Sequence, residues 1–390
     1  MTSNTWRFEL RPGRGKPGPG EAGGDDRLRG VTRRLTARRS ERHRGEPWRD
    51  WAAIGLLIHA QMLTVAVLDP GWPWLLLAAL PLSLTFATGT LTILHDAGHR
   101  RFSRRTWPNV WAVQTAIPLG FFVQHWTLKH RVHHRSSQVY PLDEATRNTT
   151  IRMHPGVERR PHHRYQHLYA WFLYALVWVG ELHSQLTYVR KGNVPGVEVP
   201  PFRVRLGQWL FEKSFWALVV SPYAVLLGLG RFTLYFLVAM SLSAVQAAIV
   251  LVVGHINEGL YAPSEQPAPR DWSRHLVATT ASFSTRSLPM RWLTGGMTHH
   301  LAHHLKPVAP RHQLPELHTT VVAKVVRDSG LPLVEYPTLT SATISHYRRL
   351  RELGRTDGGP PVVTGPTPGR PASVPRPRSA ASSERAVRST

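Results

Sequence analysis

The chain has 390 residues, no cysteine, 22 histidines and a formal net charge of +24 at neutral pH. The lack of cysteine excludes disulfide bonds, iron–sulfur clusters, zinc–thiolate sites and thiol nucleophiles on this chain, so any metal must be held by nitrogen and oxygen ligands. The high positive charge is compatible with nucleic-acid binding or with membrane association. Because the basic residues flank apolar segments, the pattern favours a membrane protein with no nucleic-acid partner.

The two ends of the chain differ in composition from its middle. Residues 1–47 and 355–390 are rich in Arg, Pro, Gly and Ser and have too little apolar content to offset the entropy of folding, so we predict disordered tails. Residues 48–354 are expected to form one membrane domain. Four apolar runs in it are long enough to span a bilayer, at 51–68, 74–94, 206–229 and 232–254.

The distribution of basic residues predicts how these spans are oriented. The turn at 69–73 has no Lys or Arg, whereas Arg44, Arg49, Arg100 and Arg101 lie at the opposite ends of the first two spans. Since cytoplasmic segments are enriched in Lys and Arg, we expect the turn outside and both termini in the cytoplasm, in a bacterial cell membrane. The predicted fold class is an all-α integral membrane protein with four transmembrane helices and a cytoplasmic helical cap that carries a histidine-rich di-metal site.

Several shorter segments complete this picture. The apolar runs at 109–123 and 169–180 are too short to span, so we expect them to be re-entrant or to lie in the membrane interface. Glu212, near the start of the third span, is expected to reach the headgroups or to pair along its helix. Amphipathic helices are expected at 314–328 and 340–353, the second ending at Gly354 in the C′ position.

Histidines recur at spacings that bring imidazoles together on a helix. His300, His303 and His304 form an H-x-x-H-H motif, and the same spacing occurs at His130, His133 and His134, with a shorter H-x3-H pair at His95 and His99. Positions i, i+3 and i+4 fall on one side of a helix, so the three imidazoles of a box are expected to converge on one small volume. Three such boxes, each beside an apolar segment, are a specific indication of metal binding.

The number of histidines also indicates how many ions they hold. Eight or nine imidazoles exceed what one ion can use while leaving room for a substrate, so we expect two ions. An all-nitrogen site suits Fe, Zn, Cu or Ni, and affinity alone favours copper or zinc over iron. A site at a membrane face, with access to acyl chains, favours a redox-active metal that activates O₂, and this context favours iron.

Together the motifs resemble the three histidine boxes of the membrane-bound fatty acid desaturase family: His95-Asp-Ala-Gly-His99, His130-x-x-His133-His134 and Gly295-Gly296-Met297-x-x-His300-x-x-His303-His304. The resemblance covers about residues 50–354. It implies a di-iron centre that uses O₂ and two external electrons to introduce a double bond into a long acyl chain. The H-x3-H form of the first box and the histidine at the start of the third are similar to the acyl-lipid group, which implies a lipid-linked substrate.

The resemblance also implies roles for particular residues. The ligands would be His95, His99, His130, His133, His134, His255, His300, His303 and His304. Asn257 is an alternative to His255, through a water molecule, and Asp96 and Asp143 are candidates to orient ligating imidazoles. His299 is an extra histidine, expected to face solvent or to support a ligand from behind. Since the chain has only a fragment of the cytochrome b5 motif, at His154, the electrons are expected from a separate ferredoxin-like or cytochrome b5-like donor and its reductase.

Two other functions remain as alternatives. A hydroxylase or related oxygenase on the same scaffold, acting on an acyl chain or a specialised metabolite, would have the same boxes. A histidine-rich metal transporter would place ligands and carboxylates along a pathway at mid-membrane. Because the boxes lie at helix ends and in predicted cytoplasmic segments, the pattern favours an enzyme.

Overall fold

The computed structural model describes residues 45–195, 197–260 and 271–356, and within them it is mostly helical. Most of both predicted disordered tails lies outside the described residues. Four helical segments are long and apolar enough to cross a membrane. They are α2 (Glu46–Leu68), the continuous segment Trp72–Gly98, α9 (Phe202–Leu227) and α10 (Leu229–Val252). This confirms the predicted all-α membrane fold with four spans.

The bounds of the spans differ from the predicted ones in ways that have local causes. The second span is longer because α3 (Trp72–Gly89) continues through a π-helical turn, η2 (Thr90–Leu94), into α4 (His95–Gly98). His95 therefore belongs to the spanning segment itself. The third and fourth spans separate at Gly228, whose φ of 81° ends α9. Only glycine adopts that conformation without strain, so the chain turns there, and α10 begins directly after it.

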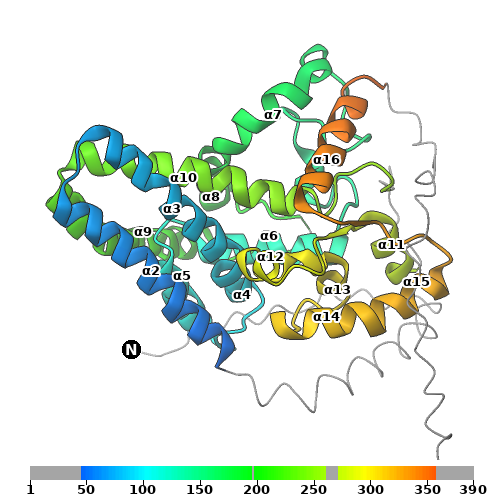
Figure 1. Cartoon of the computed structure of the whole chain (residues 1–390), viewed down its shortest axis with the longest axis horizontal. Coiled ribbons are helices and arrows are strands. Elements are labelled where there is room, and N and C mark those ends of the chain that lie inside the picture. The colour runs from blue at the N-terminus through cyan, green and yellow to red at the C-terminus, as the bar shows by residue number, and fades with distance from the viewer. Residues whose placement is uncertain (1–44, 196, 261–270, 357–390) are drawn as a thin grey trace, which may run out of the picture.

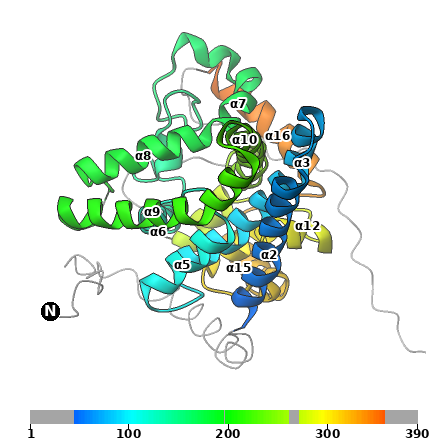
Figure 2. The same ribbon diagram turned by 90° about the vertical axis from the view of Figure 1, so that its left-hand side faces the viewer.

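The four spans pack as an elongated bundle (Figure 1). α3 runs along α10, and α2 contacts both α3 and α9. Ile58, Leu82, Phe86 and Phe236 are buried between the helices, while many leucines and valines on the outer surface remain exposed. The view from the side that is on the left in Figure 1 shows α2 beside α3 and α8 beside α9 (Figure 2). An apolar outer surface is what a lipid environment requires of a spanning bundle.

The short apolar segment after the first box does not span, as predicted. It forms α5 (Thr106–Ala116), and the chain then loops back into α6 (Val123–Ser136). Glu212 of α9 holds this return, because its carboxylate accepts hydrogen bonds from Val123 N at 2.8 Å and from Gln114 Nε2 at 3.1 Å. Its side chain is wholly buried, so the expectation that Glu212 reaches the headgroups is wrong. Unpaired amide donors inside the protein are costly, and the buried carboxylate satisfies them.

The remaining elements form a cap at the end of the bundle opposite the turns that join α2 to α3 and α9 to α10 (Figure 1). The predicted interfacial segment is two helices, α7 (Gln166–Ala175) and α8 (Val177–Lys191), with a break at Leu176. The cap also contains η3 (Glu144–Arg147), η4 (Pro161–Tyr165), α11 (Trp272–Thr279), β1 (Ser282–Phe283), α12 (Leu288–Leu293), η5 (Met297–His299), α13 (His300–Leu305), η6 (Arg311–Gln313), α14 (Leu314–Leu317), η7 (His318–Val322), α15 (Ala323–Ser329), β2 (Glu335–Tyr336) and α16 (Leu339–Leu353). β1 and β2 pair in parallel, an element that the sequence pattern did not indicate.

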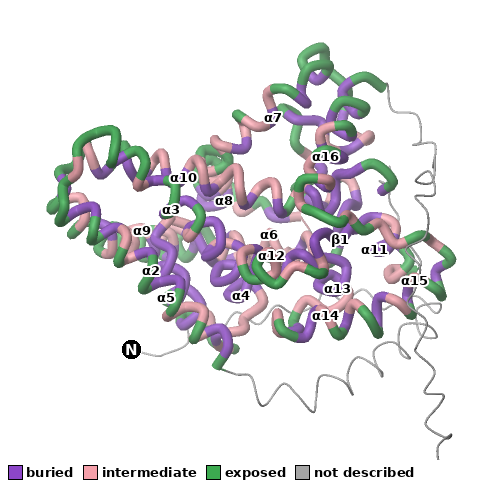
Figure 3. The backbone as a smooth tube through the Cα atoms, viewed as in Figure 1, coloured by how far each residue is buried: buried purple, intermediate pink, exposed green. Residues whose placement is uncertain are grey.

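The last helix ends at the predicted glycine for a different reason than expected. Gly354 has a φ of −75°, so it is not the left-handed C′ residue that the prediction assumed. A Cβ at this position would lie 2.1 Å from the carbonyl oxygen of His163, so only glycine allows α16 to approach η4. Elsewhere, α4, β1 and α13 are almost wholly buried (Figure 3).

Candidate metal centre

The three histidine boxes meet where the bundle joins the cap. His95 lies in α4, with His99 directly after it, while α6 carries the second box and α13 the third. His255 follows α10 in a short turn, at the same end of the bundle. Four segments far apart in the chain thus bring nine imidazoles to one region.

Glycines allow the first and third boxes to come this close. A Cβ at Gly295, whose φ is 60°, would lie 2.1 Å from the carbonyl oxygen of Leu91 in the π-helical turn. A Cβ at Gly254 would lie 2.5 Å from the ring of His300, and one at Gly98 would meet Trp126 at 2.4 Å. π-Helical turns expose a bulged backbone and are common at functional sites. Because these three glycines have no side chain, the segments that carry the boxes can lie this close together.

Five imidazoles form what we call the first cluster: His95, His99, His130, His134 and His303. Their Nε2 atoms follow one another at short distances, from His95 to His303 at 3.0 Å, from His303 to His134 at 3.0 Å, from His134 to His130 at 3.2 Å and from His130 to His99 at 2.9 Å. All three boxes contribute to it.

A second cluster lies beside the first and contains His133, His255 and His304, with His300 next to them. The Nε2 atom of His255 lies 3.0 Å from that of His304 and 3.0 Å from that of His300. The Nε2 atoms of His300 and His304 are 3.2 Å apart. The extra histidine after α10 therefore belongs with the boxes, although it is 45 residues from the nearest histidine of the third box.

Each H-x-x-H-H box divides between the two clusters, so the expectation that one box converges on one volume is wrong. Consecutive residues on a helix point about 100° apart, so the adjacent histidines of a box face different sides. His134 joins the first cluster and His133 the second, while in α13 His303 joins the first and His304 the second. Two adjacent histidines on one helix thus supply one candidate ligand to each of the two clusters.

The spacing within the clusters fits metal ligands. Imidazole nitrogens bind metals such as zinc at about 2.0–2.1 Å, and two ligands at right angles around one ion are then about 3.0 Å apart. The observed Nε2 to Nε2 distances of 2.9 to 3.2 Å match this separation. Either cluster can therefore hold one metal ion, and the set contains nitrogen ligands that suit iron, copper, nickel or zinc.

Burial keeps most of these imidazoles in the neutral form that binds metals. Burial lowers the pKa of His99 and of His255 to about 3, and it holds the pKa well below its ordinary value for His130, His134, His300, His303 and His304. A neutral imidazole has a lone pair available for a metal, so these groups do not need to lose a proton at neutral pH before binding.

His133 and His255 have partners that fix their orientation. His133 donates from Nδ1 to the buried carboxylate of Asp143 at 2.9 Å. Burial alone would lower the pKa of His133, but the Asp143 charge outweighs it and raises the pKa. His255 donates from Nδ1 to the carbonyl oxygen of Thr279 at 3.0 Å. In both cases Nε2 is left without a proton. A backbone acceptor such as Thr279 leaves no signal in the sequence.

Asp96 and Asn257 lie elsewhere. The Asp96 carboxylate pairs with Arg101 at 2.7 Å, and Arg101 also pairs with Glu46 at the start of α2. Among the described residues no hydrogen bond joins Asp96 to a box histidine, so its observed contact fixes the loop after the first box. Asn257 is buried and donates to the carbonyl of Val253, while its Oδ1 has no partner among the described residues.

Two histidines outside the boxes have structural contacts. His299 is buried, with 2 % of its surface exposed, so the solvent-facing alternative is wrong. Its Nδ1 lies 2.9 Å from Thr298 Oγ1, and its ring contacts that of His318. His59, inside α2, bonds to the Tyr223 hydroxyl of α9 at 2.7 Å. Neither belongs to a cluster.

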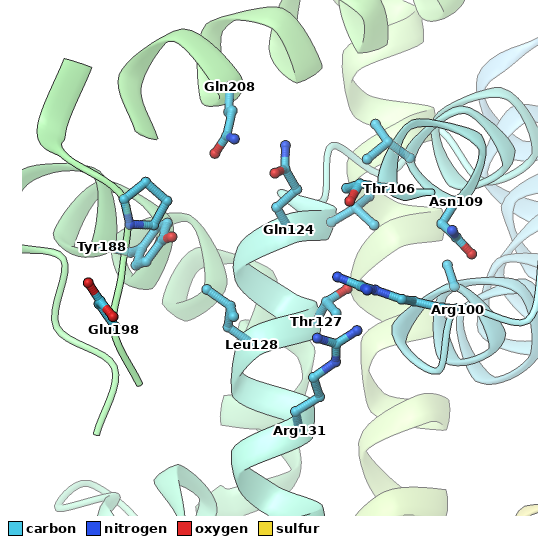
Figure 4. Close-up of a pocket in the computed structure, with 14 residues that line it drawn as sticks. Arg100, Thr106, Asn109, Gln124, Thr127, Leu128, Arg131, Tyr188, Glu198 and Gln208 are labelled. Carbon is cyan, nitrogen blue, oxygen red and sulfur yellow. The ribbon is translucent and has the colours of Figure 1, made fainter. Parts of the chain in front are cut away.

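A pocket adjoins the first cluster on the side of α5, α6 and α8 (Figure 4). Arg100 and Arg131, which directly follow the ligand candidates His99 and His130, both line it. Burial and the neighbouring Arg100 lower the pKa of Arg131 to about 10, so the Arg131 side chain remains charged at neutral pH. The analysis of the histidine motifs missed this arginine pair, because their proximity depends on how α6 packs against the loop after α4.

Comparisons with known proteins match this architecture. The family model described as fatty acid desaturase matches residues 70–337. The sn-1 linoleoyl-lipid 6-desaturase of Synechocystis sp. is 27% identical over 298 residues, covering 73% of this chain and 82% of the relative. The protein of the same name from Arthrospira platensis is 25% identical, covering 74% and 81%, and the acyl-lipid (8-3)-desaturase of Physcomitrium patens is 26% identical, covering 68% and 58%. Because the family model covers the second, third and fourth spanning helices and most of the histidine-bearing cap, the chain belongs to the fatty acid desaturase family.

Proposed function

We propose that this protein is a di-iron acyl-lipid desaturase that introduces a double bond into a long fatty acyl chain at the cytoplasmic face of the membrane. The observation that carries the proposal is the convergence of nine imidazoles in two clusters at the end of a four-helix membrane bundle. The relatives with the names of acyl-lipid desaturases support a lipid-linked substrate.

The proposed ligands are the nine histidines of the two clusters. His95, His99, His130, His134 and His303 would hold one ion, and His133, His255, His300 and His304 the other. When bound, two iron ions would supply the activation of O₂ that no side chain of this protein can provide. Asp143 keeps the proton of His133 on Nδ1 and so directs its other nitrogen at the ion.

The overall reaction sets what else the protein must receive. Conversion of a CH₂–CH₂ pair into a cis double bond, with O₂ reduced to two molecules of water, consumes two protons and two electrons beyond those of the substrate. We propose that a separate ferredoxin-like or cytochrome b5-like carrier supplies the electrons. The chain has no cysteine to hold an iron–sulfur cluster of its own.

The proposed substrate path follows from the position of the clusters. An acyl chain would enter between the spanning helices and pass beneath α5, which contacts both α2 and α9. Buried apolar side chains around the first box, such as Ile93, Leu94 and Ala97, would exclude water from the reacting carbons.

The test is expression in a host that lacks desaturases, together with a ferredoxin and its reductase, followed by mass spectrometry of total fatty acids. We expect products two mass units lighter than their parents and about two iron atoms per purified chain. His303→Ala should abolish product and reduce bound iron, since His303 of the third box contacts both His95 of the first box and His134 of the second. Products sixteen units heavier would indicate a hydroxylase, and active enzyme with zinc and no iron would contradict the proposed metal.

A further inference from the structure

The pocket beside the first cluster has polar groups that the proposed chemistry does not use. Its walls come from the loop after α4, from α5, α6 and α8, from the segment before α9 and from α9 itself. Val110, Val123 and Leu128 give it apolar walls, and the amides of Gln124 and Gln208 lie at one side (Figure 4).

Arg100 and Arg131 lie together in this pocket, and neither has a salt-bridge partner among the described residues. Figure 4 shows their guanidinium groups next to one another, reaching in from the α4 loop and from α6. Within the part of the chain that the structure describes, neither forms a salt bridge or a side-chain hydrogen bond. Nearby arginines do: Arg101 pairs with Asp96, and Arg311 pairs with Asp50 at 2.8 Å.

The backbone at the first box contributes to this arrangement. Arg100 has a φ of 55°, a left-handed conformation that residues with a Cβ adopt at a cost. Two like charges side by side in a partly buried pocket repel each other as well. An anion bound between the two guanidinium groups would offset both unfavourable features. A phosphate suits this position, because its oxygens can accept hydrogen bonds from both planar guanidinium groups.

We propose that Arg100 and Arg131 form a binding site for the phosphate of a phospholipid substrate, and so place its acyl chain at the metal centre. This inference rests on the proposed desaturase function. The pocket lies at the start of α9 and beside α5, where a lipid headgroup would meet the cap. Glu198 lines the opposite side, and its carboxylate disfavours a second anionic group there. A headgroup with one phosphate suits this distribution of charge.

Two sources of the phosphate have to be separated, a membrane phospholipid and the phosphates of a thioester carrier such as acyl-CoA. The apolar walls and the position at the membrane face favour the phospholipid. The experiment therefore uses the full-length, iron-loaded protein in a neutral sugar detergent and titrates it with phosphatidylglycerol, with monogalactosyldiacylglycerol of the same acyl chains, and with acyl-CoA. Native mass spectrometry counts the bound molecules and gives the relative affinities.

The variant Arg100→Gln/Arg131→Gln should weaken phosphatidylglycerol binding at least tenfold and leave galactolipid binding unchanged. The control variant Arg190→Gln/Arg203→Gln removes the same charge from exposed positions at the end of α8 and the start of α9. Its affinity for phosphatidylglycerol should stay within twofold of that of the unchanged protein. Arg100→Lys/Arg131→Lys should retain most of the affinity. Equal iron content and thermal stability in all variants show that they are folded.

Two results would overturn the proposal: equal loss of phosphatidylglycerol binding in both glutamine variants, or tighter and arginine-dependent binding of acyl-CoA. Because binding is measured without turnover, failure of the desaturase assay with intact arginine-dependent phospholipid binding would count against the proposed function alone.

Discussion

At the scale of single residues, the metal centre depends on side chains that hold the imidazoles in place. Nine imidazoles can bind metal only if their lone pairs point inward, and the proton on the other ring nitrogen needs an acceptor. Asp143 does this for His133, and its own position is fixed because it also accepts a hydrogen bond from Gln138 N at 2.9 Å. The carboxylate thus holds the imidazole of His133 in a fixed orientation.

Asp143→Asn should therefore lower metal affinity roughly ten- to a hundredfold. The amide retains the size of the carboxylate but loses the charge that stabilises the proton on His133 Nδ1. Metal retention against a chelator of known affinity measures the effect. Asp328→Asn, in an exposed pair with Lys324 on α15, is the matched control and should retain metal like the unchanged protein. Equal retention in both variants would contradict the role assigned to Asp143.

His346 predicts a pH dependence of stability outside the metal centre. It is fully buried in α16 and bonds to Ile256 O at 2.7 Å and to the Tyr174 hydroxyl at 2.7 Å. Burial lowers its pKa from 6.5 to about 4, so below pH 6.5 the unfolded chain binds a proton that the folded chain excludes. The stabilising contribution of His346 is complete above pH 6.5 and decreases as the pH falls, by about 2 kcal/mol at pH 5.

The destabilisation caused by His346→Gln should accordingly be largest near pH 7.5 and smaller at pH 5, as measured by thermal unfolding in detergent. His183→Gln, at an exposed position of α8, should differ little from the unchanged protein at either pH. A constant difference between His346→Gln and the unchanged protein across this range would show that the protonation of His346 is not linked to folding.

At the scale of elements, close backbone contacts determine how the boxes meet. The π-helical turn η2 places the Leu91 carbonyl against Gly295, and no side chain fits between them. α9 contributes in a similar way through Glu212, whose carboxylate fixes the start of α6 and hence the second box. Helix packing, rather than the histidine motifs alone, thus sets the geometry of the clusters.

Gly295→Ala should reduce the unfolding free energy by more than about 3 kcal/mol, because the new Cβ meets a backbone oxygen and the left-handed φ adds strain. Gly230→Ala is the matched control. Gly230 lies within α10 with no atom near the position of a Cβ, so alanine there should be neutral or stabilising by about 0.5–1 kcal/mol. Equal stability of the two variants in a thermal melt would contradict the packing described for Gly295.

At the scale of the whole molecule, the bundle and the cap differ in the types of residue that they carry. Many exposed leucines and valines lie on the outer surface of the four spans, and the two histidine clusters lie where the bundle joins the cap. Asp69 and Arg231 form an ion pair at 3.0 Å where the turn after α2 meets the start of α10. The two ends of the bundle therefore differ in chemistry, and we expect this difference to set the orientation of the protein in a membrane.

Single cysteines test this orientation directly in a chain that has none of its own. A membrane-impermeant maleimide added to intact cells should label Gly71→Cys, in the turn between the first two spans. It should label Thr319→Cys, at an exposed position of the cap, only after the cells are permeabilised. The expectation follows from the basic residues at the cap end of the bundle. The reverse labelling pattern would contradict a cytoplasmic active site.

The sequence by itself determined the features that depend on local chemistry. The length of an apolar run decides whether a helix can span, so the four spans and the short, non-spanning α5 were predictable. Spacings of three and four residues place histidines near one another on a helix, so the eight histidines of the three boxes were identifiable without coordinates, whereas His255 was indicated only by the family resemblance.

Only the tertiary structure decided how those residues are combined. His133 and His134 are adjacent in the chain but belong to different clusters, because neighbouring helical residues face different sides and meet different partner segments. Glu212 is buried, and Arg100 lies beside Arg131, because helices distant in sequence pack against each other there. Such contacts depend on the relative positions of whole helices, which no local pattern of residues specifies.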